Sequence, residues 1–169
     1  MTRPTVVYFG AGSEREGLSP YKVYLRALLF ATSKRGRVIE GIYVTLIHNE
    51  AQQNFNIWVY GNDNKFVRGS GLFIGETGIA SSHHFMMSSE KNAFQFSEGL
   101  YRVEVHAHIL GDRNNKLLYS ETFELSTEHT LAIQNVEGGV YFDWEPDSSG
   151  YVPHYDMHRP KDSGVKYDR

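Results

Sequence analysis

A chain of 169 residues is close to the most common domain size, and this length predicts one compact domain with a full hydrophobic core. Its 17 basic and 20 acidic residues give a formal net charge of −3, which lacks the basic excess that binding to a phosphate backbone needs and argues against a nucleic-acid partner. The sequence has no cysteine, which excludes disulfides, thiolate zinc sites and cysteine nucleophiles.

The amino-terminal segment does not have the features of an export signal. It carries one basic residue, Arg3, and runs directly into a short strand-like segment at residues 5–9, whereas a signal peptide needs a longer apolar region. Apolar runs elsewhere are far shorter than the ~18 residues that span a bilayer. We therefore expect a soluble, cytoplasmic protein without a membrane partner.

Strand-forming segments recur along most of the chain and predict an all-β fold. Connections rich in Gly, Asn, Ser and charged residues separate them at 33–36, 49–54 and 61–64, as expected between antiparallel strands. Residues 21–31 also contain good helix formers, but the alternation from Tyr21 to Leu29 favours a strand. The predicted strands are residues 5–9, 21–31, 38–48, 55–60, 65–74, 84–87, 93–96, 100–110 and 117–125.

The clearest strand pair is a predicted hairpin whose arms flank a loop at residues 111–115. In the first arm, apolar residues from Tyr101 to Ile109 alternate with polar ones, which is the period-two signature of a strand with one face in a core. The loop is rich in Gly, Asp and Asn, which are turn formers. The spacing of the predicted strands suits an antiparallel sandwich or barrel.

The order around this hairpin resembles the last three strands of immunoglobulin-like and fibronectin-type domains, with a short strand at 93–96, a turn and then two long arms. Tyr101 stands near the tyrosine-corner position of those domains, and Trp58 near the place of their core tryptophan. The resemblance covers residues 21–125 and implies an immunoglobulin-like antiparallel β-sandwich without a particular activity. Further strand-like sequence at residues 129–144 predicts an additional C-terminal hairpin.

The chain changes character at Pro146. From there it has three of the five prolines, no periodicity and balanced charge, which predicts an extended tail. We therefore expect a single β-sandwich domain over residues 1–145 and an extended C-terminal tail over residues 146–169. Tyr151 and Tyr155 bury much surface for little loss of rotamer entropy, so they are candidates to dock this tail onto the domain or onto a partner.

Candidate metal ligands lie on the predicted strand at residues 100–110. His106 and His108 form an H-x-H pair whose imidazoles share one strand face, and Glu104 on the same face supplies a carboxylate. The alternative is a set of polar residues on a solvated sheet face. The sequence therefore predicts either a transition-metal site, as in a metal-binding protein or metalloenzyme, or an ordinary wet face, and no other cofactor.

No serine-nucleophile motif of the G-x-S-x-G kind is present, and we assign no catalytic residue. Several strands look apolar on both faces, which predicts a surface covered by the tail, by a further strand layer or by a partner. We therefore expect a non-catalytic protein-interaction module that binds a protein partner or self-associates within a larger assembly. The alternative is a carbohydrate-binding module in which Trp58, Tyr60 or Trp144 stacks on a sugar. The candidate partner-binding residues are Trp58, Tyr60, Trp144, Tyr151 and Tyr155.

Overall fold

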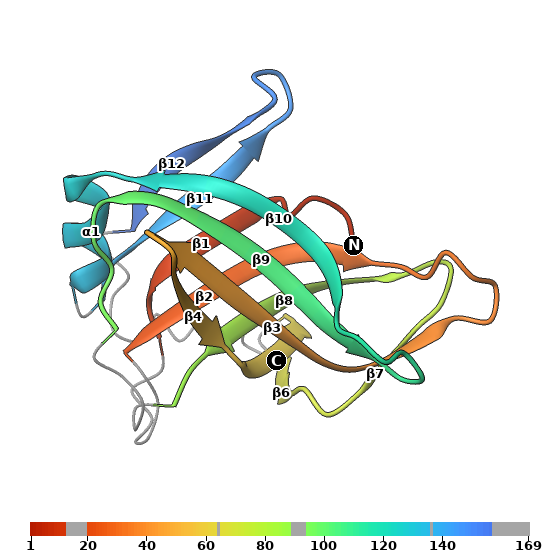
Figure 1. Ribbon diagram of the computed structural model, residues 1–169. Coiled ribbons are helices and arrows are strands. Elements are labelled where there is room, and N and C mark those ends of the chain that lie inside the picture. The colour runs from red at the N-terminus through yellow and green to blue at the C-terminus, as the bar shows by residue number, and fades with distance from the viewer. Residues whose placement is uncertain (13–19, 64, 89–93, 136, 157–169) are drawn as a thin grey trace.

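A computed structural model of the protein describes residues 1–12, 20–63, 65–88, 94–135 and 137–156 (Figure 1). No helix in these ranges is long and apolar enough to cross a membrane. The elements in chain order are β1 (Val6–Ala11), β2 (Tyr21–Leu29), β3 (Arg37–His48), β4 (Ala51–Phe55), β5 (Ile57–Asn62), β6 (Lys65–Arg68), β7 (Leu72–Ile74), β8 (Ile79–Met86), β9 (Gly99–Ile109), β10 (Lys116–Leu125), α1 (Thr127–Gln134), β11 (Gly139–Glu145) and β12 (Gly150–Asp156).

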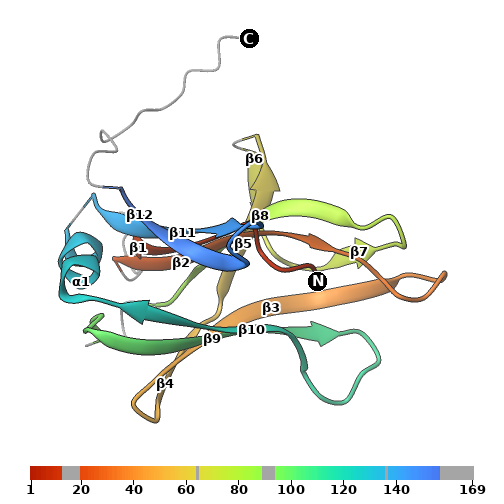
Figure 2. The same ribbon diagram turned by 90° about the horizontal axis from the view of Figure 1, so that it is seen from above.

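The strands form two antiparallel sheets that pack face to face, as the view in Figure 2 shows. The seven-stranded sheet has the order β12-β11-β1-β2-β8-β5-β6. The five-stranded sheet has the order β10-β9-β3-β4, and β7 also pairs with β3. The predicted fold class, an all-β antiparallel sandwich, is therefore confirmed.

The alternation in β9 explains why this strand belongs to a two-layer core. Its core-facing residues Tyr101, Val105 and Ala107 are at most 1% exposed, whereas Arg102 on the opposite face is exposed. Because successive side chains of a strand point to opposite faces, one face of β9 packs against the other sheet while the second stays wet. The same alternation in β2 buries its core-facing residues, so residues 21–29 form a strand, as predicted.

β4 lies in a segment that the sequence predicts to be a connection. Residues 49–54 are mostly polar, yet Ala51–Phe55 pairs with the end of β3, and Asn49 and Glu50 make a tight turn with positive φ angles of 47° and 66°. Two successive positive φ angles are typical of the hairpin turns that match strand twist. The backbone ladder holds this edge strand although its side chains show no apolar alternation.

The short strand predicted at residues 93–96 is not present. Residue 93 lies outside the described part of the chain, and residues 94–96 have no strand pairing. Side chains hold the segment instead, because Phe96 is 1% exposed and its carbonyl accepts a hydrogen bond from Gln134 Nε2 at 3.0 Å. The alternation of apolar residues in this segment, which predicted a strand, therefore reflects core packing and not strand pairing.

Helix α1 occupies part of the segment that the sequence predicts to be a strand-like arm at residues 129–144. Ser126 caps the helix: its side-chain oxygen accepts from the N–H of His129, and the His129 ring accepts in return from the N–H of Ser126. This reciprocal arrangement satisfies two backbone donors at the start of the helix. The buried face of α1 packs against β1 and β11, next to the ends of the sheets.

The predicted tail begins with a strand of the sandwich. Gly150–Asp156 forms β12, which pairs with β11 along its whole length, so the boundary predicted at residue 146 falls in the turn of a hairpin. This β11–β12 hairpin is an additional C-terminal hairpin of the predicted kind, but its second arm lies later than expected. The rest of the predicted tail, residues 157–169, lies outside the described residues.

An aromatic cluster closes the core at the end of the sandwich near α1. Phe9 of β1 is fully buried, and its ring centroid lies 5.8, 5.7 and 5.8 Å from those of Phe96, Phe123 and Phe142. Phe123 belongs to the five-stranded sheet, whereas Phe9 and Phe142 belong to the seven-stranded sheet. The cluster therefore joins the two layers.

Tyr101 ties the start of β9 to the preceding turn. Its hydroxyl accepts a hydrogen bond from the backbone N–H of Ser97 at 3.0 Å, which is the kind of upstream contact that a tyrosine corner makes. Its ring is 1% exposed and stacks on His48 with a centroid distance of 4.3 Å.

Replacing Tyr101 with Phe is expected to lower the free energy of unfolding by about 1–2 kcal/mol, because the partly buried N–H of Ser97 loses its acceptor. Urea denaturation measures this change. Tyr43→Phe is the matched control, since the Tyr43 hydroxyl accepts only from the exposed side chain of Asn115 and its loss should cost less than about 0.5 kcal/mol. Equal stabilities of the two variants would contradict a structural role for the Tyr101 hydroxyl.

Candidate functional site

The predicted metal ligands lie on the outer face of the five-stranded sheet but do not converge. His106 Nε2 lies 3.1 Å from Glu104 Oε2, whereas His108 contacts Glu40 Oε2 and Asn115 Oδ1, each at 3.1 Å. Across the described ranges, no group of three or more His, Cys, Asp or Glu side chains is placed to hold a metal ion. The structure therefore places these residues in separate polar pairs on a wet sheet face.

Of the predicted partner-binding aromatic residues, Trp58 lies inside the sandwich and Tyr60 is partly buried beside it. Trp58 is 2% exposed, and its indole N–H donates to Nδ1 of His83 at 3.1 Å. Tyr60 stacks on Trp58 with a centroid distance of 4.8 Å and packs against the core. Because the Trp58 ring is enclosed, it cannot act as a stacking platform for a sugar in this structure.

The other three predicted aromatic residues lie together on the β11–β12 hairpin. The ring centroids of Trp144 and Tyr151 are 5.2 Å apart, and the Tyr155 hydroxyl donates to Glu128 Oε2 of α1 at 3.1 Å. The hairpin brings these residues close because Trp144 and Tyr151 are directly opposite in the β11–β12 register. Trp144 and Tyr151 line a cleft.

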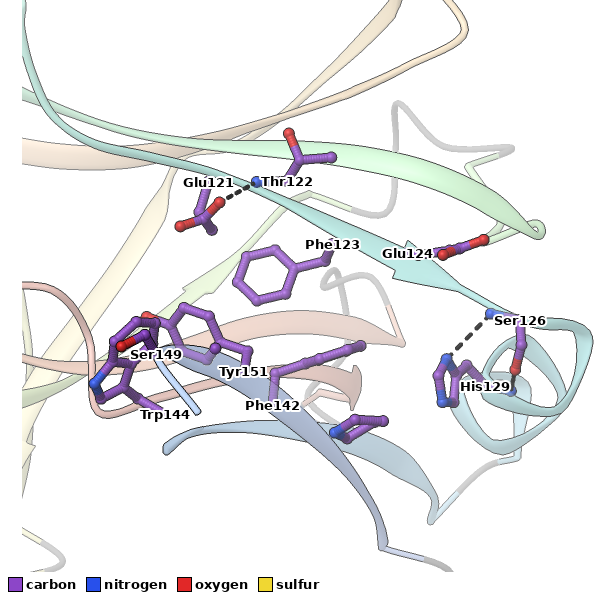
Figure 3. Close-up of a pocket in the computed structure, with 12 residues that line it drawn as sticks. Glu121, Thr122, Phe123, Glu124, Ser126, His129, Phe142, Trp144, Ser149 and Tyr151 are labelled. Atoms are coloured by element: carbon purple, nitrogen blue, oxygen red, sulfur yellow. Dashed lines mark hydrogen bonds between the residues drawn. The ribbon is translucent and has the colours of Figure 1, made fainter. Parts of the chain in front are cut away.

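The cleft has a volume of about 450 Å³ and opens between β10 and the β11–β12 hairpin, with the start of α1 at one end (Figure 3). β10 and β12 are edge strands of the two different sheets, so the cleft follows the open seam of the sandwich. The residues that line it are Glu121, Thr122, Phe123, Glu124, Ser126, His129, Phe142, Trp144, Ser149, Gly150, Tyr151 and Pro153.

Aromatic rings make the floor of the cleft. The Phe123 centroid lies 5.0 Å from that of Phe142 and 5.1 Å from that of Tyr151, and both pairs are inclined. His129 adds a ring at the helix end, 5.7 Å from Phe142. At the other end, the Arg3 guanidinium lies 4.0 Å above the Trp144 ring, a cation–π contact made within the chain.

Two tyrosine hydroxyls link β10, β12 and the segment before β1 next to the cleft. The Tyr119 hydroxyl donates to that of Tyr151 at 3.0 Å, and the Tyr151 hydroxyl donates to the carbonyl of Pro4 at 2.7 Å. Burial raises the pKa of both phenols above the ordinary value of 10, and for Tyr119 the hydrogen bond to Tyr151 raises the pKa further. Both side chains are therefore neutral hydrogen-bonding groups at physiological pH.

The charged side chains that line the cleft are carboxylates, and Arg3 lies at its far end over Trp144. Two of the lining residues, Glu121 and Glu124, are carboxylates, and none of the described lining residues is Lys or Arg. Glu121 lies on the same face of β10 as Tyr119 and Phe123, and its Oε1 accepts from the N–H of Thr122 at 3.1 Å. An inward carboxylate on an edge strand is one way in which proteins discourage indiscriminate strand pairing.

The backbone edge beside the cleft is unpaired within the described residues, where β10 pairs only with β9 and β12 only with β11. The N–H of Thr122 donates to the carboxylate of Glu121, so a strand added at this edge would compete with Glu121 for this donor. On the opposite side, Pro153 has no N–H and interrupts the row of donors that β12 could offer. β10 is therefore the better template for an added strand.

Sequence reasoning found part of this site and missed the rest. Trp144 was a candidate as an aromatic stacking platform and Tyr151 as a tyrosine of the predicted tail, but Phe123, Phe142 and His129 were not candidates. The available signal was Glu121, a charge on the apolar face of a predicted strand.

The cleft offers apolar rings and carboxylates beside the edge strand β10, which together suit the binding of an extended chain. No known family model, no curated protein and no solved structure matches this protein.

Proposed function

We propose that the protein is a non-catalytic protein-interaction module that binds an extended peptide in the cleft beside β10. The observation that carries this proposal is the open edge of β10 next to a cleft of about 450 Å³ with an aromatic floor. An exposed strand edge binds an extended peptide by adding it as a further strand, with affinity from main-chain hydrogen bonds and specificity from pockets for alternate side chains.

The geometry fits this mode of recognition. Thr122 faces the open edge with its N–H, and the residues two positions away on either side, Ser120 and Glu124, present their backbone groups in the same direction. A peptide paired with this row would direct every second side chain towards the rings of Phe123 and Tyr151. Apolar side chains at these alternate positions are the expected anchors.

The carboxylates around the cleft favour basic residues at the remaining positions of the peptide. Glu121 and Glu124 line the cleft and Glu128 lies beside it at the start of α1, where Tyr155 donates to its carboxylate. Lys or Arg side chains on the peptide would complement these groups and speed its association. We therefore infer an occupant in which aliphatic or aromatic residues alternate with basic ones.

The immunoglobulin-like resemblance of residues 21–125 belongs to the same proposal. Its support is the hydrogen bond between Tyr101 and Ser97 and the enclosed ring of Trp58. Domains of this architecture carry many unrelated functions, so the cleft and not the fold is the basis for the proposed binding.

Selection from a random-peptide display library tests the proposal. We expect enriched peptides with alternating apolar and basic residues, and a synthetic copy of one should bind the full chain more weakly as salt is raised. Thr122→Pro should weaken this binding at least tenfold, because it removes a backbone donor from the edge strand β10.

Thr122→Val is the matched control, since it keeps the backbone N–H and should bind the peptide as well as the natural chain does. Melting temperatures of all variants show whether each is folded. Equal binding by Thr122→Pro and Thr122→Val would refute strand addition at β10, and the absence of any enriched peptide would refute the cleft as a peptide site.

A further inference from the structure

A row of ring-bearing side chains crosses the outer face of the seven-stranded sheet. The strand register places His154 opposite Tyr141, Tyr141 opposite Tyr8, Tyr8 opposite Tyr24, and Tyr24 opposite His84. With neighbouring strands about 4.8 Å apart, the row extends over roughly 19 Å. These five residues, which we call the ring row, come from β12, β11, β1, β2 and β8.

The ring row points away from the core of the sandwich. The residues that alternate with it in sequence, such as Val7, Phe9 and Val23, are fully buried between the sheets. Because successive side chains of a strand point to opposite faces, the ring row belongs to the outer face. Tyr24 and Tyr141 are partly exposed there.

Tyr8 anchors the row. It is 4% exposed, and its ring lies over the paired glycines Gly10 and Gly139, where an added Cβ would come within 2.4 Å of the Tyr8 ring or hydroxyl. Its hydroxyl donates to the carbonyl of Gly138 at 3.2 Å. The two glycines therefore give room for a tyrosine to lie flat on the sheet and to support its neighbours.

A hollow of about 660 Å³ lies over this face, within the size range of sites for small ligands. Four members of the ring row line it. Figure 2 shows β6 turning out of the plane of the sheet. Phe66 of β6 also lines the hollow and meets the ring of His84 edge-on at a centroid distance of 4.8 Å.

The charges of the hollow are mixed. Lys22 lines it together with Asp63 and Asp143, and Asp143 lies 3.6 Å from the imidazole of His154. Ser82 adds a hydroxyl, which lies within 3.4 Å of that of Tyr24. A surface with both signs of charge gives no field that would select a polyanion or a polycation.

We propose that this outer face is a second binding site, separate from the cleft beside β10, and that its ligand is a neutral oligosaccharide. Aromatic rings offer apolar faces for the C–H surfaces of sugar rings, and the hydroxyl of Ser82 and the carboxylate of Asp143 match hydroxyls that both donate and accept hydrogen bonds. The carbohydrate ligand expected as an alternative from the sequence is thus assigned to rings other than Trp58, Tyr60 and Trp144.

An array of neutral and acidic glycans, followed by calorimetric titration with the best neutral oligosaccharide, tests this site. We expect binding to neutral members of the array, with at least a tenfold loss of affinity in Tyr24→Ala and retained affinity in Tyr24→Trp, which restores an aromatic face. Tyr155→Ala is the matched control, because Tyr155 is an exposed tyrosine on the opposite face of the same sheet and its loss should leave the affinity unchanged.

Thermal melting of each variant shows whether it is folded, and Tyr24→Phe provides a second variant in case Tyr24→Ala is not. Tyr24→Phe should keep most of the affinity, because it keeps the ring. Three results would each overturn the proposal: no binding of any neutral glycan at millimolar concentration, binding of acidic glycans alone, or the same affinity in Tyr24→Ala and in Tyr155→Ala.

Discussion

Lowering the pH from 7 to 4 is expected to reduce the free energy of unfolding by up to about 3 kcal/mol through His83 alone. His83 is 1% exposed and lies on β8, facing the core. Burial lowers the pKa of its imidazole from 6.5 to about 4, and the positive charge of Arg26 lowers the pKa further. In the unfolded chain the imidazole regains its ordinary pKa.

The sign of this effect follows from the two pKa values. Between pH 6.5 and 4 the unfolded chain binds a proton at His83 that the folded protein does not bind. The contribution of neutral His83 to the free energy of unfolding is therefore fully present above pH 6.5. This contribution is lost progressively as the pH falls towards 4. A proton on Nδ1 would also deprive the Trp58 indole N–H of its acceptor, since Trp58 donates to that atom.

Urea denaturation at pH 7 and pH 4 measures the change, and His83→Phe is the informative variant. Phenylalanine does not titrate and removes the buried Nε2, which has no hydrogen-bond partner in the described part of the structure. The stability difference between pH 7 and 4 should be smaller in His83→Phe than in the natural protein.

Parallel loss of stability in the natural protein and in His83→Phe would show that other groups cause the acid sensitivity. The comparison uses differences within each protein, so a uniform change in stability caused by the substitution does not affect the result.

The elements that sequence predicted well are those whose signal is local. β9 alternates from Tyr101 to Ile109 because one face is dry, and the same logic identified residues 21–29 as a strand despite their helix-forming residues. β4 had no such signal, because it is an edge strand with polar side chains that pairs through its backbone. α1 had a signal, Ser126 followed by a capping side chain at His129, but histidine is not the usual residue there.

The candidate sites depend on which strands become neighbours, and this is not a local property. The ring row needs β11, β1, β2 and β8 side by side, an order that places the first strand next to the eleventh. The cleft needs the edges of two sheets to meet, which gives Glu121 a place among rings although in sequence it only interrupts an apolar face. His106 and His108 were conspicuous in sequence, but the sheet placed them in separate pairs.

Replacing Phe9 with Ala is expected to lower the free energy of unfolding by about 3–5 kcal/mol, the range for deleting a buried phenylalanine ring. Phe9 is fully buried and contacts three other phenylalanine rings, which belong to both sheets and to the segment before β9. Truncation leaves a cavity between the layers and removes these aromatic contacts.

The same substitution should also weaken peptide binding in the cleft. Phe123 and Phe142 pack on Phe9 with one side of their rings and form the cleft floor with the other. Phe73→Ala is the matched control: Phe73 is 60% exposed, so its loss should change stability by less than about 0.5 kcal/mol and leave peptide binding intact. Urea denaturation measures both variants. If Phe9→Ala lowers the free energy of unfolding no more than Phe73→Ala does, the aromatic cluster does not join the two sheets. The inference that Phe9 supports the cleft floor would then be contradicted as well.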